Sequence, residues 1–125
     1  MIPNKDKALK LFSKLRLAVV GHVEWMTFIK VKHFPKAGII THALNSKEMP
    51  GGGGAVAAIK MADLTQEKVH FFTSLGNDVI GRECYKFLQR RGLEVHVAWR
   101  SEPTRKGISL VDEKADRSIT VIGKR

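Results

Sequence analysis

Residues 68–99 read KVHFFTSLGNDVIGRECYKFLQRRGLEVHVAW, and this stretch determines the fold class. Two apolar runs, 68–76 and 93–99, are typical of buried strands, and the segment between them is typical of a helix. Two strands joined by a helix within about 30 residues form a βαβ unit, whose strands run parallel with a right-handed crossover. The sequence therefore predicts an α/β fold built on a parallel sheet.

The helix expected over residues 77–92 carries signals at both ends. Asn77 or Asp78 is the expected N-cap, and Gly92 ends the helix. The apolar stripe of this helix consists of Ile80, Cys84, Phe87 and Leu88. Because Cys84 lies on the stripe, we expect a buried core thiol and not a nucleophile. A single cysteine cannot form an internal disulfide, which indicates a reducing compartment.

Upstream of this unit, the sequence predicts a short helix, a strand and a β-ribbon. Residues 5–15 form an amphipathic helix capped by Asn4, and RLAVVG at 16–21 is a buried strand. The expected ribbon covers residues 26–44, with a turn at PKAG and a return strand at GIITHAL, residues 38–44. The apolar face of the first helix is expected to contain Ala8, Leu11, Phe12 and Leu15.

The chain closes with KGISLVDEKADRSITVIG, residues 106–123, which predicts a hairpin around the polar DEKAD turn. Three parallel strands plus a ribbon make a thin sheet with open edges. We therefore expect these residues to be the first part of a larger domain.

The composition is that of a globular protein with an excess of positive charge. Hydrophobic residues make up 43% of the 125-residue chain, which argues against disorder, and the net charge is +10. The charge either reflects scattered solvated lysines or favours an anionic partner. With no signal peptide and no apolar run long enough to span a bilayer, we expect a cytoplasmic protein without membrane contact.

Four consecutive glycines precede a second helix in EMPGGGGAVAAIKMADL, residues 48–64. The helix is expected over 55–64. No GK[ST] follows the glycines, and neither the preceding strand nor the spacing of a dinucleotide fingerprint is present, which excludes both phosphate-binding motifs. The glycines are therefore either a binding loop, with backbone N–H groups at a helix N-terminus, or a plain turn. The predicted helix face contains Ala55, Ala58, Ile59 and Ala62.

The histidines show no metal-ligand spacing, so we expect surface or satisfied core side chains and no metal site. They are His22, His33, His42, His70 and His96. No Ser/His/Asp or Cys/His arrangement is recognisable either.

The order of the motifs resembles the ribokinase-like (PfkB) family of sugar kinases. The resemblance is carried by VVG at the end of the first strand, the FPKAG turn, PGGGGAVAA, TSLGNDVIGRECYKFLQRRGLEV, and the PT pair with its hairpin. It implies a ribokinase-like α/β fold, here a partial parallel-sheet βαβ domain with a projecting β-ribbon lid. Residues 16–125 are then the substrate and lid portion of the kinase domain, and residues 1–15 an N-terminal helical extension.

The resemblance also implies where a substrate binds. In the family the ribbon is a lid over the sugar, and the glycine loop contacts sugar hydroxyls through its backbone. Gly52 and Gly53 are then substrate-loop positions, and Gly51 and Gly54 allow the close approach.

Two positions depart from the family pattern. Val56 stands where the family usually has an Asn, and Met26 stands where an Asp binds hydroxyls. Glu24 and His22 supply the nearby polar atoms, and Glu24 can accept hydroxyl hydrogen bonds in place of the missing Asp. These departures argue against an ordinary ribose-like substrate.

Each of the other candidate positions has a structural interpretation and a ligand-binding interpretation. Trp25 either packs at the lid hinge or stacks on the ligand, and Thr104 is either a turn residue or a substrate contact. Asn77 and Asp78 are a helix cap, to which the resemblance adds a substrate-side alternative. The expected substrate-binding set is Glu24, Trp25, Gly52, Gly53 and Thr104.

The family's catalytic Asp, in a GAGD-like motif, and its ATP site lie in the C-terminal half and have no counterpart in these residues. We therefore expect no catalytic, cofactor-binding or metal-binding residues in this chain. In a complete relative, the cofactors are expected to be ATP and Mg²⁺. The leading hypothesis is the substrate-binding half of a truncated carbohydrate kinase, inactive alone. Complete relatives transfer the γ-phosphate of ATP to a sugar or nucleoside hydroxyl.

Two rival hypotheses remain open. One is a non-catalytic basic module that binds nucleic acid or another anionic ligand, although no aromatic platform for single strands is evident. The other is an unstable fragment without a function of its own. For the leading hypothesis we expect a homodimer through the exposed edges of residues 26–44.

Overall fold

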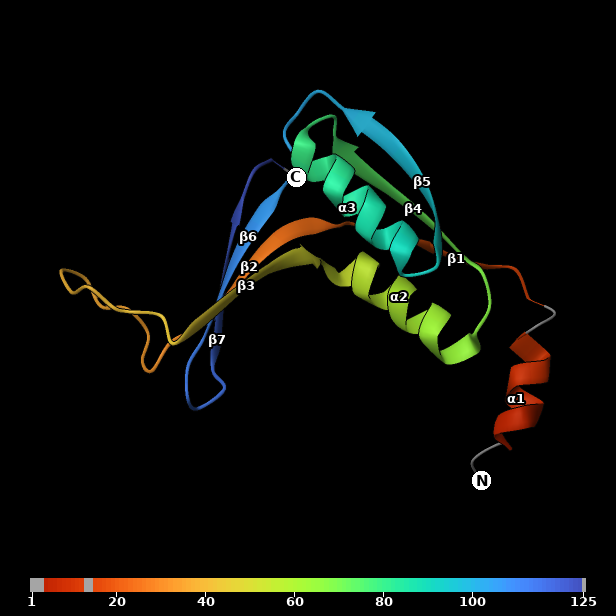
Figure 1. The fold of residues 1–125 in the computed structure, drawn as a ribbon, viewed down its shortest axis with the longest axis horizontal. Coiled ribbons are helices and arrows are strands. Elements are labelled where there is room, and N and C mark those ends of the chain that lie inside the picture. Colours follow the sequence, from red (N-terminus) through yellow and green to blue (C-terminus); the bar gives the residue numbers. More distant parts are fainter. Residues whose placement is uncertain (1–3, 13–14, 125) are drawn as a thin grey trace.

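The computed structural model describes residues 4–12 and 15–124 as two sheets with helices packed on one of them (Figure 1). The elements, in chain order, are α1 (Lys5–Phe12), β1 (Leu17–Val20), β2 (Glu24–Lys30), β3 (Asn45–Gly51), α2 (Gly53–Thr65), β4 (Val69–Gly76), α3 (Val79–Arg90), β5 (Leu93–Arg100), β6 (Lys106–Val111) and β7 (Arg117–Ile122). None of the described helices combines the length and apolar character needed to cross a bilayer.

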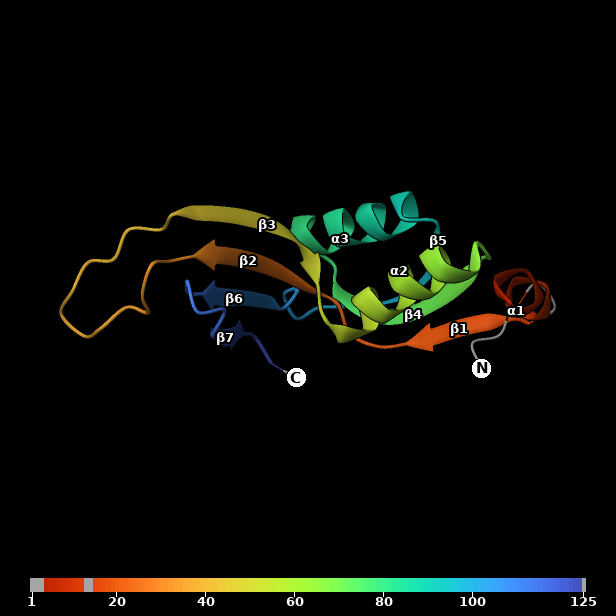
Figure 2. The ribbon, with the colours of Figure 1, turned by 90° about the horizontal axis from the view of Figure 1, so that it is seen from below.

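The first sheet is parallel, in the order β1-β4-β5. Leu17 pairs with Val69, and Val69 with Leu93, so the carboxyl ends of the strands meet at one edge. Both α2 and α3 lie over the same face of this sheet (Figure 2). The predicted α/β class and the βαβ unit of residues 68–99 are confirmed.

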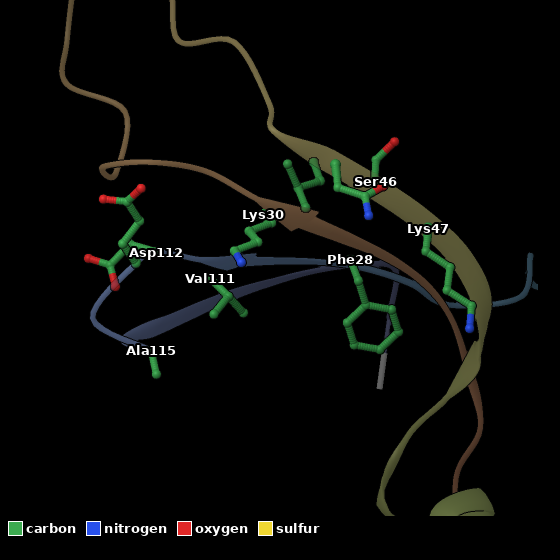
Figure 3. Close-up of a pocket in the computed structure, with 10 residues that line it drawn as sticks. Phe28, Lys30, Ser46, Lys47, Val111, Asp112 and Ala115 are labelled. Carbon is green, nitrogen blue, oxygen red and sulfur yellow. The ribbon is translucent and has the colours of Figure 1, made fainter.

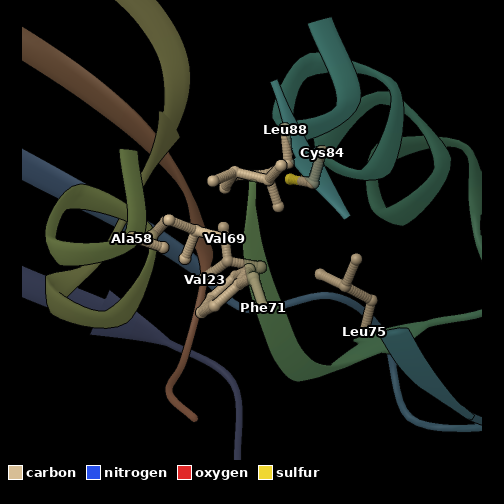
Figure 4. Packing of buried hydrophobic residues seen from close by; sticks show 9 residues of the cluster. Val23, Ala58, Val69, Phe71, Leu75, Cys84 and Leu88 are labelled. Carbon is tan, nitrogen blue, oxygen red and sulfur yellow. The ribbon is translucent and has the colours of Figure 1, made fainter. Parts of the chain in front are cut away.

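The core lies between the parallel sheet and its two helices (Figure 4). Of the predicted helix stripe, Cys84 and Leu88 are fully buried, while Ile80 and Phe87 pack against the cluster. Burial, and the negative charges of Asp78 and Glu83, raise the pKa of Cys84 to about 12, so the thiol stays protonated as expected of a core residue. The buried cluster consists of Val23, Ala55, Ala58, Val69, Phe71, Leu75, Cys84, Leu88 and Leu93.

The expected lid corresponds to a second sheet in the order β3-β2-β6-β7, which is called the lid sheet, or lid, from here on. The predicted ribbon exists, but its strands lie at other residues than the predicted 26–44. The strands β2 and β3 pair antiparallel, with Glu24 opposite Gly51 and Lys30 opposite Asn45. Residues 31–44 form the loop that projects beyond the sheet (Figure 2).

The predicted return strand at 38–44 is therefore wrong. Its β-branched residues have no strand to pair with, and Ile39 and Ile40 are 66% and 87% exposed. The polar run NSKEMPG forms the strand instead because it lies opposite β2, and pairing outweighs intrinsic β-propensity.

The C-terminal hairpin is confirmed as β6 and β7, paired antiparallel. The sequence did not indicate that β6 also pairs with β2, in parallel, with Trp25 opposite Lys106. Through this pairing the hairpin widens the lid into a four-stranded sheet.

The N-terminal helix begins as predicted, because the Asn4 side chain accepts a hydrogen bond from the Asp6 N–H at 3.1 Å. The described helix covers Lys5–Phe12, residues 13–14 of the predicted helix lie outside the described residues, and Leu15 is not helical and has 50% of its surface exposed. The side chains of Leu11 and Phe12 lie outside the described part of the chain.

Asp78 joins three elements. It is the N-cap of α3, where Oδ1 accepts a hydrogen bond from the Gly81 N–H at 2.7 Å. Its Oδ2 accepts from the Thr104 N–H at 2.8 Å, and the Thr104 hydroxyl donates to Oδ1 at 2.8 Å. The same hydroxyl accepts from the Gly76 N–H at 3.1 Å. The end of β4, the start of α3 and the segment entering β6 are thereby held together.

The Asp78 carboxylate makes stability depend on pH. Partial burial raises its pKa, but the hydrogen bonds from Thr104 and Gly81 outweigh burial and hold the pKa below its ordinary value of 3.8. A lowered pKa stabilises the fold above the unfolded value and loses this contribution as the pH falls through the folded one.

We expect Asp78→Asn to lower the free energy of unfolding at pH 7 by about 1–2 kcal/mol, because charge-assisted hydrogen bonds are lost. Urea titrations at pH 7 and pH 3 measure this. The difference between wild type and variant should shrink from pH 7 to pH 3, because Asp78 takes up a proton more readily in the unfolded chain than in the folded one. Asp116→Asn, at an exposed position in the β6–β7 turn, is the matched control. Equal pH dependence in Asp78→Asn and wild type would contradict the assignment.

Candidate functional site

The end of β1 and the first turn of α2 touch through bare backbone. A Cβ atom on Gly21 would lie 2.6 Å from the Gly54 Cα, and one on Gly54 would lie 2.7 Å from the His22 nitrogen. Gly52, the residue before the helix, has a φ of 99°, which favours glycine. Gly21, Gly52 and Gly54 are therefore the glycines required where the strand end meets the helix N-terminus, at the carboxyl edge of the sheet.

Gly52 stands at the N-cap position of α2 but has no side chain that could accept a hydrogen bond, and His22 accepts hydrogen bonds from the first turn instead. The Gly53 N–H donates to His22 Nε2 at 3.3 Å, and the Ala55 N–H donates to the His22 carbonyl at 3.3 Å. The imidazole is 55% exposed. A ligand hydroxyl that binds the Gly53 amide would take the place of this imidazole, which has room to turn into solvent.

Glu24 is buried beside this junction, at the start of β2. Its Oε1 lies 2.6 Å from the Arg105 guanidinium and 3.9 Å from His22 Nε2. The side chains of Glu24 and Arg105 are 7% and 20% exposed, so the ion pair is largely removed from water. This pair links β2 to the segment entering β6, and it uses one oxygen of the carboxylate.

The structure brings Glu24, Gly52, Gly53 and His22 together, but not the other expected positions. Trp25 follows Glu24 in the strand and so faces the opposite side, where it packs against the core cluster. Thr104 is 4% exposed, and its hydroxyl is bonded to Asp78 and Gly76.

The two departures from the family pattern have different surroundings. Val56 is 52% exposed on α2. Met26 is buried, and its side chain fills the space above Gly51 and Gly107, where an added Cβ on either glycine would overlap it. Met26 is therefore a packing residue of the lid base.

A cavity of about 360 Å³ opens at the carboxyl ends of the parallel strands. In open α/β sheets this edge is where ligands bind. The cavity is lined by His22, at the glycine junction, and by Arg105, of the buried ion pair. The full lining is Val20, Gly21, His22, Phe72, Thr73, Ser74, Arg100 and Arg105.

Most of the unsatisfied buried polar atoms line this cavity. Within residues 4–12 and 15–124, five buried side-chain polar atoms have no hydrogen-bond partner. Four of them belong to the cavity lining: Thr73 Oγ1, Ser74 Oγ, Arg100 Nε and Arg105 Nε. Buried polar groups are nearly always paired with protein, water or a ligand, so four unpaired ones on the residues of one cavity make it the candidate place for a polar ligand.

The sequence did not single out Thr73, Ser74, Arg100 or Arg105 as binding residues. For Thr73, Ser74 and Arg100 the available signal was their position at or just beyond the carboxyl ends of predicted strands, which is where α/β proteins place ligand-binding groups. Arg105 precedes the predicted hairpin and carried no such signal. Without the order of the strands in the sheet, these residues could not be grouped.

A second hollow, of about 440 Å³, lies on the lid sheet (Figure 3). Phe28 and Val111 line it together with Lys30, Lys47 and Asp112. None of the five unpartnered buried atoms found in the described residues belongs to its lining. We therefore place the candidate site at the strand ends and not on the lid.

Gly53 and Gly54 offer a matched pair of substitutions. A Cβ on Gly53 would meet only His22 Cε1 at 3.6 Å, an ordinary contact, whereas one on Gly54 would meet backbone. We expect Gly54→Ala to lower the free energy of unfolding by about 1–3 kcal/mol. Gly53→Ala should leave it unchanged or raise it, since Ala favours a helix over Gly. Urea unfolding measures both, and equal losses would contradict the close approach.

Known proteins with similar structures cover most of this chain. The ribokinase of Thermotoga maritima shares 28% sequence identity over 86% of the chain, with a TM-score of 0.74. The Arabidopsis thaliana ribokinase, solved with ribose and ATP, shares 26% identity over 86%, with a TM-score of 0.66. The nucleoside kinase of Methanocaldococcus jannaschii is 16% identical over 86%, with a TM-score of 0.67, and shows the shared fold alone.

The chain spans about a third of the length of these proteins, 36% of the Thermotoga enzyme and 35% of the Arabidopsis enzyme. No curated protein matches the sequence. The profile of the pfkB family carbohydrate kinases matches residues 14–124. The ribokinase-like fold expected from the motifs is thus confirmed, and the protein belongs to the pfkB family of carbohydrate kinases.

Proposed function

We propose that this chain forms the substrate-binding and lid portion of a carbohydrate kinase, and that the cavity at the strand ends binds a sugar or nucleoside through its hydroxyls. The four unpartnered polar atoms at the cavity carry the proposal. Membership of the family supports it, as does the ribose complex of the Arabidopsis relative.

The chemistry of the lining suits a polyhydroxylated ligand. Thr73 and Ser74 each offer a hydroxyl that can donate or accept, and the guanidinium Nε atoms of Arg100 and Arg105 donate only. A sugar has both donors and acceptors on adjacent carbons, so it can satisfy this mixture where a simple apolar ligand cannot. The Gly53 amide, now bonded to the His22 side chain of the cavity lining, is a further donor.

Phosphoryl transfer in this family would use ATP, with Mg²⁺ neutralising the phosphate charge. Mg²⁺ prefers carboxylate and phosphate oxygens. The carboxylate at the candidate site is Glu24, which is held by Arg105 at 2.6 Å. This donor set does not fit Mg²⁺, and we assign neither Mg²⁺ nor ATP to these residues.

The lid sheet is proposed to cover the substrate and to form a dimer contact. The lid and the cavity are joined by the Glu24–Arg105 ion pair and by the hydrogen bond from the Trp25 N–H to the Arg105 carbonyl at 2.9 Å. A movement of the lid would therefore shift Arg105 in the cavity lining. On the lid itself, Phe28 is 38% exposed, and a second lid packed on it would remove this side chain from water.

Thr73→Val tests the substrate site without damaging the fold, because it removes a buried hydroxyl that has no partner. We expect sugar binding to weaken about tenfold, the effect of one lost hydrogen bond. The melting temperature should not fall. Thr120→Val, at an exposed position on the outer lid strand β7, is the same chemical change and should leave binding intact.

Isothermal titration calorimetry with D-ribose, D-fructose, fructose 6-phosphate and adenosine measures this effect, with NMR shifts locating the site. Binding of at least one compound, with shifts at Thr73 and Gly53, supports the proposal. Binding of none, or equal binding by Thr73→Val and wild type, would overturn it. If oligonucleotides or inorganic phosphate bind in place of every sugar, the chain is a basic binding module.

For the dimer, we expect light scattering to give twice the monomer mass for the wild type and one monomer mass for Phe28→Asp. The charge introduced at Phe28 would be buried in the contact, which is unfavourable. Val79→Asp introduces the same charge at a side chain that is 77% exposed and outside the lid, so it should remain dimeric. A monomeric wild type at high concentration would rule the contact out.

A further inference from the structure

Two histidines and a glutamate meet on the parallel sheet, away from the sugar-binding groups. His70 on β4 pairs in register with Glu94 on β5, and His96 follows Glu94 by two residues. Residues two apart in a strand share a face, so the three side chains project from the same side of the sheet. This is the face opposite the one covered by α2 and α3, since the alternating residues Val69 and Phe71 belong to the core.

The spacing of the histidines in the sequence predicted no metal site, yet two of them meet in the structure. His70 Nδ1 lies 3.0 Å from His96 Nε2, and the ligand atoms of His70, Glu94 and His96 all lie within 4.8 Å of one another. Sequence spacing did not reveal the cluster, because the partners come from strands that are 26 residues apart in sequence.

The separation of the two nitrogens suits a shared metal ion. Two metal–nitrogen bonds of about 2.0–2.1 Å at a tetrahedral angle place the nitrogens about 3.3–3.4 Å apart. The present 3.0 Å separation needs only a small opening of the pair to reach this value. Without a metal, one nitrogen must donate its proton to the other, and the Glu94 carboxylate plays no part in that bond.

Neighbouring side chains hold the cluster in position. The Phe72 ring stacks on His96 with ring centroids 4.4 Å apart and planes inclined by 12°. The His70 and His96 rings are stacked at 5.3 Å with planes inclined by 16°. Glu94 is held by Lys68, whose ammonium lies 2.5 Å from the carboxylate. The imidazoles are part-buried, and the Glu94 side chain is 38% exposed, so the cluster is open to ions from solvent.

We propose that His70, Glu94 and His96 form a binding site for a divalent transition-metal ion of the zinc class, with a fourth position open to water or another ligand. Imidazole ligands favour Zn²⁺, Ni²⁺, Co²⁺ and Cu²⁺, whereas Mg²⁺ and Ca²⁺ prefer all-oxygen sites. Lys68 competes with the metal for Glu94. The site lies beside the cavity through Phe72, which belongs to both, but it does not depend on a sugar binding there.

Titration calorimetry with ZnCl₂ on chain stripped of metal tests this site, and the visible spectrum of the Co²⁺-loaded chain reports its coordination. We expect one ion per chain, and a tetrahedral Co²⁺ spectrum. His96→Ala should weaken Zn²⁺ binding at least about tenfold, since even outer-shell losses reach that figure. Lys68→Met should tighten binding because it frees the carboxylate.

His42→Ala is the control, as His42 is exposed in the lid loop, away from the cluster. It should bind Zn²⁺ as the wild type does, and circular dichroism should confirm that all variants are folded. Glu94→Gln, which keeps the size of the side chain, serves if His96→Ala fails to fold and should also weaken binding. The proposal would be overturned if the wild type bound no Zn²⁺. It would also be overturned if His96→Ala and Glu94→Gln both bound Zn²⁺ as tightly as the wild type.

Discussion

The contact between Gly21 and Gly54 is the constraint on which the rest of the structure depends. A Cβ atom on either glycine would lie 2.6 Å from the Cα of the other, so no side chain fits at either position. This contact sets the N-terminus of α2 against the carboxyl end of β1. It also places His22 over the first turn of the helix, and it fixes where the chain leaves the parallel sheet after β1 and enters β2 of the lid sheet. Residues that are distant in sequence therefore converge at one edge.

Polar side chains near this edge fall into two groups, and hydrogen bonding separates them. Asp78 and Thr104 use their polar atoms on each other and on Gly76 and Gly81, so they hold the fold together. Thr73 and Ser74 instead present buried hydroxyls with no partner. Leaving such groups unpaired costs stability, and a bound ligand would remove that cost. Satisfied groups thus belong to the scaffold, and the unsatisfied groups mark the place that we propose for the ligand.

Local sequence signals predicted the elements that local interactions form. The helix over Val79–Arg90 has its cap at Asp78 and its stop near Gly92, and both signals lie within the segment itself. The return strand of the lid was misplaced because Asn45–Gly51 gains its strand conformation from pairing with β2, which no local pattern reveals. The parallel pairing of β2 with β6, the cavity lining and the His70–His96 contact depend in the same way on strand order. The family resemblance indicated Glu24 and the glycines as candidate binding residues, but it could not show that the Glu24 carboxylate forms an ion pair with Arg105.

A single NMR measurement tests the central claim most directly: the nuclear Overhauser effect between the α protons of Gly21 and Gly54 in the ligand-free chain. The close backbone approach predicts a strong cross-peak, together with one between the His22 ring and the Gly53 amide. Absence of both cross-peaks in a folded, fully assigned sample would mean that the strand end and the helix N-terminus do not meet. The proposal of a preformed sugar-binding edge would then be contradicted.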